Sequence, residues 1–244
     1  MDLRNKLDCL VINLDRSPER FSQMQEQLDF FDLPFRRISA VDGKKVTFTK
    51  REINVAAYER CHGKYVTPTE VACYISHYKA LQAFVQGDKE YALILEDDMV
   101  LSEDFLFIVQ DLIEHYSSWD MVKLNGCHRA FPVAQRESYK DYKLVINLFQ
   151  QTKSGAYLVN RIAAKNYLKD LLPMVVPYDH EFTKQWKYNI KICSVVPFPT
   201  WEKGEDSTID YVMVNKYKKP WYKRIKTLEY RTNIALKRIW YGLH

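Results

Sequence analysis

The stretch Tyr91–Asp98, YALILEDD, joins five apolar residues to three consecutive carboxylates. A short, continuous apolar run of this kind is typical of a strand that is buried on both faces of a parallel sheet. The run predicts a central strand over 91–95 with an acidic cluster at its carboxyl end. Because ligands of open α/β sheets bind outside the carboxyl ends of the strands, the cluster also marks a candidate site.

The segments around this strand alternate between helical and strand patterns. Thr67-Pro68-Thr69-Glu70 has the form of a capping box, and apolar residues follow at helical spacing as far as Gly87. At the start of the chain, 7–14 (LDCLVINL) predicts a buried strand, after which Ser17 and Pro18 predict an N-cap and a first helical turn. Further strands are predicted over 35–38, 119–124, 144–149, 156–159 and 190–196, and further helices from a Ser102 cap, over 161–172 and from Asp179 to Trp186.

This alternation predicts an α/β fold with a mostly parallel, Rossmann-like sheet flanked by helices. Asp42-Gly43 ends the second strand in a turn where glycine can adopt positive φ. Hydrophobic residues make up 47% of the 244 and charged residues 27%, which excludes a disordered or collagenous chain. No apolar run approaches the roughly 18 residues of a spanning helix, so we expect neither a signal peptide nor an integral membrane protein.

The cysteines are five in number, widely spaced and without a CxxC pair: Cys9, Cys61, Cys73, Cys127 and Cys193. This pattern predicts reduced thiols in a cytosolic protein rather than a disulfide framework or a zinc knuckle. Candidate metal ligands are therefore expected among the carboxylates.

The net charge of +5 is unevenly distributed along the chain. Residues 215–244 contain nine Lys and Arg against Glu229 alone, a net charge of +8, which leaves residues 1–214 at −3. This division predicts a folded domain over 1–214 and a basic, amphipathic, helical C-terminal tail over 215–244. Because Trp and Tyr lie among its charges, the tail favours contact with an anionic membrane surface. The alternative is a helix that packs on the domain and leaves its cationic face in solvent.

Three adjacent carboxylates raise one another's pKa unless a cation neutralises them. In a continuing strand, Glu96 and Asp98 would share one face while Asp97 points to the other, so two hard oxygen ligands would lie on one side. Mg²⁺ or Mn²⁺ suits such ligands. The alternative is a solvated acidic turn without a function.

Four motifs occur in a specific order: VINLDR at 11–16 with Arg20, AVDG at 40–43, TEVAC at 69–73 with Ser76-His77, and LEDD at 95–98. Over about residues 6–200, the chain resembles glycosyltransferase family 25, which includes bacterial lipooligosaccharide galactosyl- and glucosyltransferases and collagen galactosyltransferases. The resemblance implies a GT-A type fold, a UDP-hexose donor, Mn²⁺ or Mg²⁺ held by the acidic triplet, and inversion at the anomeric carbon.

By this resemblance, ten residues would bind the donor: Asn13, Leu14, Arg16, Arg20, Ala40, Asp42, Gly43, Ser76, Glu96 and Asp97. The metal ligands would be Glu96 and Asp98, with His180 completing the shell as a downstream histidine does in some GT-A enzymes. Arg16 and Arg20 are four residues apart near the first helix, where guanidinium groups could meet a pyrophosphate. A solvated helix start is the alternative for these two arginines.

The candidate catalytic base is Asp179, in the segment VPYDHE at 176–181, because the family carries an acid in a similar setting. Alternatively, Asp179 caps the following helix or contacts the donor sugar. His180 could instead be a simple hydrogen-bond partner of the neighbouring acid. His77 follows core-facing residues and is predicted to be a buried residue that orients a neighbour.

Together these features predict an inverting, metal-dependent transferase that moves galactose or glucose from a UDP-sugar to a lipid-linked lipooligosaccharide. Such an enzyme is expected in the cytoplasm, peripheral on the inner face of the bacterial inner membrane. A metal-dependent phosphohydrolase or nucleotidyltransferase could use the same acids. A membrane- or nucleic-acid-binding module is the non-enzymatic alternative. A net negative body with no recognised nucleic-acid motif argues against a nucleic-acid partner, because such modules carry a basic patch on the folded domain.

Overall fold

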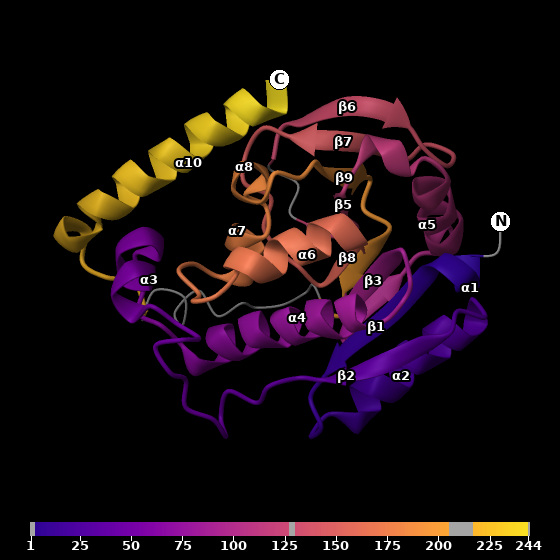
Figure 1. The fold of residues 1–244 in the computed structure, drawn as a ribbon, viewed down its shortest axis with the longest axis horizontal. Helices are drawn as coiled ribbons and strands as arrows, with labels where there is room; N and C mark the ends of the chain where they lie inside the picture. Colours follow the sequence, from indigo (N-terminus) through magenta and orange to yellow (C-terminus); the bar gives the residue numbers. More distant parts are fainter. Residues whose placement is uncertain (1–2, 127–129, 205–216, 244) are drawn as a thin grey trace.

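The computed structural model describes residues 3–126, 130–204 and 217–243 (Figure 1). Cys127, Lys216 and the predicted boundary between 214 and 215 lie outside the described residues. The other four cysteines are free thiols, as the sequence predicted. Within the described residues, no helix is both long and apolar enough to cross a membrane.

An eight-stranded sheet forms the centre of the molecule. Its strands, in spatial order, are β2 (Phe35–Ser39), β1 (Leu7–Asn13), β3 (Tyr91–Glu96), β8 (Ala156–Asn160), β5 (Met121–Lys123), β9 (Ile192–Val196), β7 (Lys143–Asn147) and β6 (Pro132–Glu137). The pairs β1–β2, β1–β3 and β5–β9 are parallel, whereas β8 is antiparallel to β3 and β5, and β7 is antiparallel to β9 and β6. Six of the eight strands therefore run in one direction, which confirms the mostly parallel sheet.

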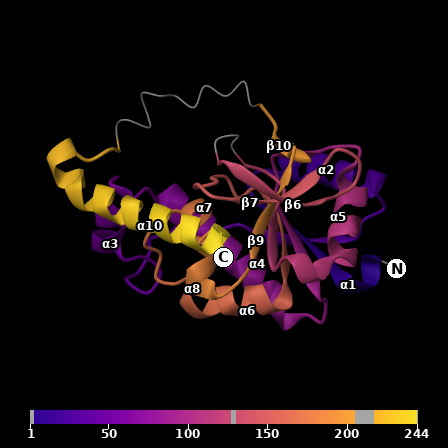
Figure 2. The same cartoon turned by 90° about the horizontal axis from the view of Figure 1, so that it is seen from above.

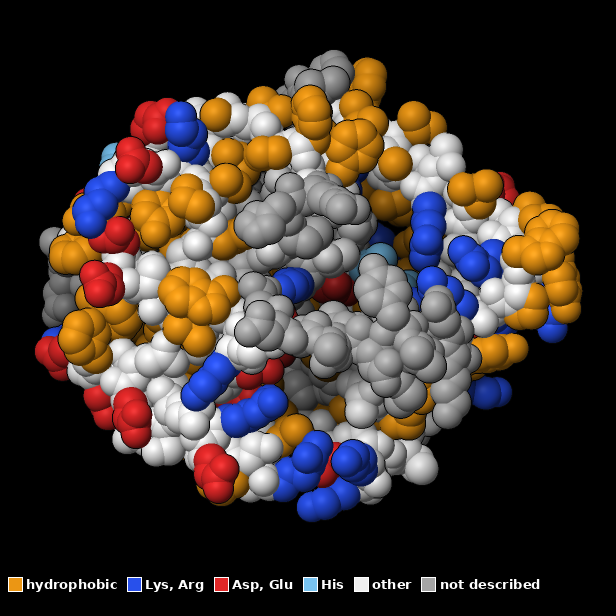
Figure 3. All heavy atoms as spheres, turned by 180° about the vertical axis from the view of Figure 1, so that it is seen from behind, with side chains coloured by type: hydrophobic (Ala, Val, Ile, Leu, Met, Phe, Trp, Pro, Cys, Tyr) orange, Lys and Arg blue, Asp and Glu red, His pale blue; other side chains and the backbone are white. Residues whose placement is uncertain are grey.

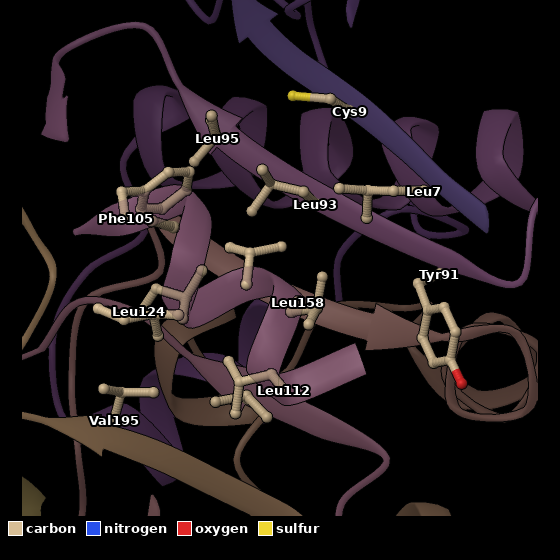
Figure 4. Close-up of a cluster of buried hydrophobic side chains, with 14 of the residues drawn as sticks. Leu7, Cys9, Tyr91, Leu93, Leu95, Phe105, Leu112, Leu124, Leu158 and Val195 are labelled. Atoms are coloured by element: carbon tan, nitrogen blue, oxygen red, sulfur yellow. The ribbon is translucent and has the colours of Figure 1, made fainter. Parts of the chain in front are cut away.

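Helices cover both faces of the sheet (Figure 2). One layer contains α2 (Pro18–Phe30) and α5 (Phe105–Glu114), and the other contains α4 (Pro68–Gln86) and α6 (Arg161–Asp170). Side chains of β1 alternate between the layers, because Cys9 and Val11 pack with α2 and α5 while Leu10 and Ile12 pack with α4 and α6. Figure 4 shows part of the hydrophobic core that packs between the sheet and the layer of α2 and α5. The remaining elements are α1 (Leu3–Lys6), α3 (Val55–His62), α7 (Tyr178–Glu181), α8 (Gln185–Tyr188), two 3₁₀ turns (Tyr116–Ser118, Trp221–Arg224), α10 (Ile225–Leu243) and the strand pair β4 (Met99–Leu101) and β10 (Thr200–Glu202).

Several local predictions need correction. Ser17 is at the N-cap of α2 but makes no side-chain cap hydrogen bond, and the N-cap of α5 is Asp104 rather than Ser102. The predicted helix from Asp179 to Trp186 is divided into α7 and α8. Thr67 does cap α4 by accepting from the Glu70 N–H, although the Glu70 carboxylate takes the Thr67 hydroxyl rather than a backbone N–H. Local patterns thus placed the elements better than they placed the caps.

The predicted tail forms α10, which docks on the body from α3 toward β7 (Figure 1). Thr227 Oγ1 donates to the Arg60 carbonyl at 2.8 Å, Arg231 Nη2 to the His62 carbonyl at 3.0 Å and Arg238 Nη1 to the Thr183 carbonyl at 3.2 Å. The residues of α10 that are most buried are polar, whereas Leu228 and Leu236 are 68% and 64% exposed. The helix therefore docks through a polar face and leaves apolar side chains in solvent.

Candidate functional site

A cavity of about 170 Å³ lies where β1, β2 and β3 end. Because these three strands are parallel neighbours, the segments that follow them meet at one edge of the sheet. The first turns of α2 and the amino-terminal half of α4 complete the lining. The cavity brings together these predicted site residues: Leu14, Arg16, Arg20, Ala40, Asp42, Gly43, Ser76, Glu96, Asp97 and Asp98.

Gly43 lets the turn after β2 approach the start of α4. A Cβ at this position would lie 2.5 Å from the Pro68 carbonyl oxygen. Gly43 does not adopt a positive φ, so the turn requires glycine for space rather than for a left-handed backbone. The Ser76 hydroxyl accepts from the Val41 N–H at 2.9 Å and fixes the same turn against α4.

Asn13 lies beneath the cavity and is almost fully buried. Its Nδ2 donates to Asp97 Oδ2 at 2.6 Å and to the Ser17 carbonyl at 2.9 Å, while its Oδ1 accepts from Arg37 Nε at 2.8 Å. Asn13 is not among the lining residues, so the structure places this predicted donor residue behind Asp97. Its amide ties the end of β1 to the acidic cluster.

The acidic triplet does not follow strand alternation. Asp97 and Asp98 form a turn between β3 and β4, and all three carboxylates line the cavity, so the expected separation of Asp97 from its neighbours is wrong. Arg20 Nη1 lies 3.5 Å from Asp97 Oδ1 and 3.3 Å from Asp98 Oδ2. One partly exposed guanidinium group therefore serves two carboxylates.

The two outer carboxylates of the triplet have opposite pKa shifts. Burial would raise the pKa of Glu96, but hydrogen bonds from His77 and Ser154 outweigh it and hold the pKa below its usual value. Burial and the charge of Glu96 raise the pKa of Asp98 to about 6, although Arg20 opposes the shift. Hard oxygen donors with this surplus of negative charge fit Mn²⁺ or Mg²⁺, which would relieve their repulsion.

His77 is buried in α4, as the sequence predicted, and the neighbour that it contacts is Glu96. Its Nε2 lies 3.1 Å from Glu96 Oε1, and its Nδ1 lies 3.2 Å from the Tyr157 hydroxyl. The ring stacks on Tyr178 with the centroids 4.2 Å apart. Both ring nitrogens thus have protein partners, and the imidazole orients Glu96 within the cavity.

Among the described residues, Cys73, His77 and Glu96 are the group of three possible metal ligands whose ligand atoms lie within 4.8 Å of one another. Burial raises the pKa of the Cys73 thiol well above its usual value, so this thiol stays protonated. A protonated thiol is a poor ligand for a hard cation. The carboxylates therefore remain the better ligands in this cavity.

His180 and Asp179 occupy a different place from the triplet. His180 lines a second cavity, of about 440 Å³, beneath α10, so the structure does not bring it to the acidic triplet. Asp179 lies within the first turn of α7 and does not cap it, and its Oδ2 accepts from the Lys153 N–H at 3.2 Å. Ser154, which follows Lys153 in the chain, donates to Glu96. One short segment thus links Asp179 to the triplet.

Lys123 is a site residue that our reading of the sequence missed. It is buried at the end of β5, and its Nζ donates to the carbonyls of Gln151, Thr152 and Lys153 at 2.8, 2.8 and 2.6 Å. These bonds hold the segment that contacts both Asp179 and Glu96. The signal was present, because a lysine in the apolar run 119–124 requires several acceptors when it is buried.

The two cavities differ in the charge of their linings. Four carboxylates and two arginines line the cavity at the strand ends, whereas His180, Lys184, Arg231 and Arg238 line the one beneath α10. Figure 3 shows acidic and histidine side chains in a hollow that Lys and Arg side chains flank. We call the first cavity the donor cavity, after the donor site that the sequence predicts there, and the second the α10 cavity.

Comparison with known proteins gives one consistent family. The family model described as "Glycosyltransferase family 25 (LPS biosynthesis protein)" matches residues 7–182. A "Glycosyltransferase 25 family member" of Aedes aegypti is 28% identical over 178 residues, which cover 69% of this chain and 29% of that protein. "Procollagen galactosyltransferase 1" of Danio rerio is 27% identical over 181 residues, or 70% of this chain and 30% of that protein.

One human relative carries a different name. "Inactive glycosyltransferase 25 family member 3" of Homo sapiens is 29% identical over 126 residues, which cover 48% of this chain and 21% of that protein. In each of these three comparisons the matched segment spans less than a third of the relative. The family model, at residues 7–182, includes every residue that lines the donor cavity.

Proposed function

The chain belongs to glycosyltransferase family 25, and we propose that it transfers galactose or glucose, with inversion, from a UDP-sugar to a lipid-linked lipooligosaccharide. One observation carries the proposal: four carboxylates and two partly exposed arginines line a single cavity at the ends of three parallel strands. A nucleoside diphosphate needs this combination of cationic groups and metal ligands. The name of the procollagen galactosyltransferase relative supports a galactosyl donor.

Arg16 and Arg20 are the proposed diphosphate contacts. Their side chains are 45% and 58% exposed, and each is held at the cavity by an acid, since Arg16 Nε donates to Asp42 Oδ2 at 3.0 Å and Arg20 lies against Asp97 and Asp98. Guanidinium groups that are held in this way can bind phosphate oxygens with little further ordering. Arg20 would turn from the carboxylates to the diphosphate when the donor and its cation bind.

Glu96 and Asp98, with Asp97 beside them, are the residues that would hold Mn²⁺ or Mg²⁺. When bound, the cation supplies electrostatic neutralisation of the charge that develops on the leaving diphosphate. His77 keeps the Glu96 carboxylate oriented, and Asn13 does the same for Asp97. These second contacts restrict the carboxylates to the cavity side.

Asp179 is the proposed general base, which would accept the proton of the attacking acceptor hydroxyl. Its Oδ2 is held by the Lys153 N–H, and Lys123 in turn holds that segment in place. Because Asp179 does not cap α7, the structure favours a role other than the cap alternative. Inversion requires this base on the side of the sugar opposite the leaving group.

The outer face of α10 is the proposed contact with an anionic membrane. Exposed apolar residues of this face and of the turn before it include Trp221, Ile225, Leu228 and Leu236. Lys223, Lys226 and Lys237 are interspersed with them. An interfacial helix of this kind inserts its apolar side chains among lipid tails while its lysines contact anionic headgroups.

The test of the function is a panel of UDP-sugars with Mn²⁺, measured first for hydrolysis alone and then with a deacylated oligosaccharide acceptor. We expect transfer with one hexose donor to exceed its hydrolysis by a wide margin. Nucleotide hydrolysis that no acceptor sugar accelerates would instead support the phosphohydrolase alternative. Absence of both reactions, with UDP still bound, would place the chain with the inactive members of the family.

A further inference from the structure

The α10 cavity contains a buried guanidinium group that faces only neutral partners among the described residues. Arg238 is 5% exposed, and it donates to the Thr183 carbonyl, the Thr183 hydroxyl and the Gln150 side-chain oxygen at 3.0–3.2 Å. No carboxylate lies within ion-pair distance of it in the described part of the chain. A buried charge without a counter-charge is costly, so an anion that entered this cavity would be stabilised.

Arg231 adds a second cation to the same wall. It lies about two helical turns before Arg238, its Nη2 donates to the His62 carbonyl at 3.0 Å, and the described residues offer it no acidic partner. Lys184 also lines the cavity, but it is paired with Glu181 at 2.5 Å. The two arginines are therefore the cations of the cavity whose charge is not offset by a neighbouring acid.

The lowered pKa of His180 reflects the positive potential of the cavity. Burial lowers its pKa, and although Asp179 opposes the shift, the charges of Arg231, Lys184 and Arg238 lower it further. Burial and the charges of His180 and Arg231 likewise lower the pKa of the adjacent His62 to about 3. Both imidazoles are thus neutral near pH 7 and can donate N–H groups without adding charge.

We propose that the α10 cavity binds an anionic group, a phosphate or a carboxylate, carried by the acceptor oligosaccharide. This inference rests on the proposed function for its choice of the acceptor. His180 lines the cavity and directly follows Asp179, so an anion held by Arg231 and Arg238 would anchor the acceptor beside the proposed base. The donor cavity, with its carboxylates, lies on the other side of the segment 153–155.

The first experiment measures the binding of inorganic phosphate to the full chain by NMR, with no donor sugar and no turnover. We expect amide shifts at α10 and α7, and we expect Arg231→Gln to weaken binding at least tenfold because no neighbouring acid offsets this charge; the amide spectrum of the variant without phosphate checks that α10 stays docked. Lys165→Gln on the exposed side of α6 is the charge-matched control and should leave the affinity unchanged. Shifts confined to the donor cavity, or an equal loss in both variants, would overturn the proposal.

The second experiment identifies the source of the anion. The KM for a phosphorylated or carboxylated oligosaccharide should rise at least tenfold in Arg231→Gln and in Arg238→Lys, while the KM for a neutral oligosaccharide and for the UDP-sugar stays the same. If the two substitutions impair transfer only in the presence of anionic vesicles, and not with the charged oligosaccharide, the cavity binds lipid headgroups. That result would contradict the proposal that the anion belongs to the acceptor. If phosphate binds through Arg231 but no sugar is transferred, the proposed function fails while the anion site stands.

Discussion

The donor cavity and the α10 cavity hold opposite charges, and the chain builds them in different ways. Three of the four acidic residues of the donor cavity are consecutive in the sequence, and the end of one buried strand carries them to the edge of the sheet. The two arginines of the α10 cavity are contributed by a helix that is remote in the sequence from the body residues that complete the lining. An acidic site can therefore be recognised in a short motif, whereas the basic site exists only once α10 has docked.

The comparison also shows what holds each site in place. Glu96 and Asp97 are fixed by His77 and Asn13, side chains of the core elements α4 and β1. The α10 cavity depends on the contacts that Thr227, Arg231 and Arg238 make with backbone carbonyls. We infer that changes to the donor cavity affect chemistry, while changes to α10 affect what the enzyme binds.

The largest expected effect is that of Asp98→Asn in the donor cavity. Loss of one carboxylate ligand should reduce Mn²⁺-dependent transfer by about 10³-fold, because such electrostatic groups typically contribute that much to the rate. Transfer assays with a metal titration measure the effect, and circular dichroism checks that the fold is kept. Full activity in this variant would remove Asp98 from the metal site.

Asp179→Asn should reduce kcat by about 10²-fold or more, as expected for loss of a general base. The affinity for the UDP-sugar should change little, because Asp179 does not line the donor cavity. Steady-state kinetics and donor binding by calorimetry separate the two quantities. Equal losses of both would indicate a donor contact instead of a base.

Lys123→Met tests the segment that joins the two cavities. Three carbonyls would lose their shared charged donor, so the free energy of unfolding should fall by about 2–4 kcal/mol, with a loss of kcat because Ser154 and Asp179 are no longer positioned. Lys143→Met, at an exposed lysine of β7, should change the free energy by less than about 1 kcal/mol. Urea unfolding of both variants makes the comparison, and matching stabilities would contradict the positioning role.

The raised pKa of Asp98 predicts a pH dependence for the donor cavity. Since its pKa in the metal-free fold is about 6, above the ordinary aspartate value of 3.8, the folded protein holds this proton more tightly than the unfolded chain. The contribution of Asp98 to the free energy of unfolding of the metal-free protein therefore declines as the pH rises from about 4 to 6. Mn²⁺ must displace the proton, so its affinity should rise about fivefold between pH 5 and 6 and level off near pH 7. A pH-independent affinity by calorimetry would contradict this.

The smallest expected effect concerns the outer face of α10. The double substitution Leu228→Asp, Leu236→Asp should weaken binding to vesicles of anionic lipid several-fold, because two exposed apolar side chains no longer enter the interface. Phe30→Asp, at an exposed phenylalanine of α2, is the matched control and should have no effect. Sedimentation with anionic and with neutral vesicles measures both variants. Unchanged vesicle binding would leave α10 as a helix whose apolar face serves another purpose.

Local sequence patterns predicted most of the sheet and the donor cavity. Buried strands such as β1 and β3 have continuous apolar runs, and α4 has a capping box followed by helical spacing, so neighbouring residues alone define them. Strand β6 was not predicted because most of its side chains are not buried and it lacks an apolar run. The short helix α3 was likewise missed, since its buried face is completed by residues far along the chain.

The sequence by itself determined the alternation of strands and helices, the acidic triplet after β3 and the family of the chain. These features depend on residues that lie within a few positions of one another, where periodicity and motifs are informative. Only the tertiary structure decided that Asp97 joins its neighbours in the cavity, that Lys123 holds the segment before β8 and that His180 faces α10. These depend on backbone turns and on contacts between residues tens of positions apart, and such contacts form only when the sheet, its layers and α10 pack together.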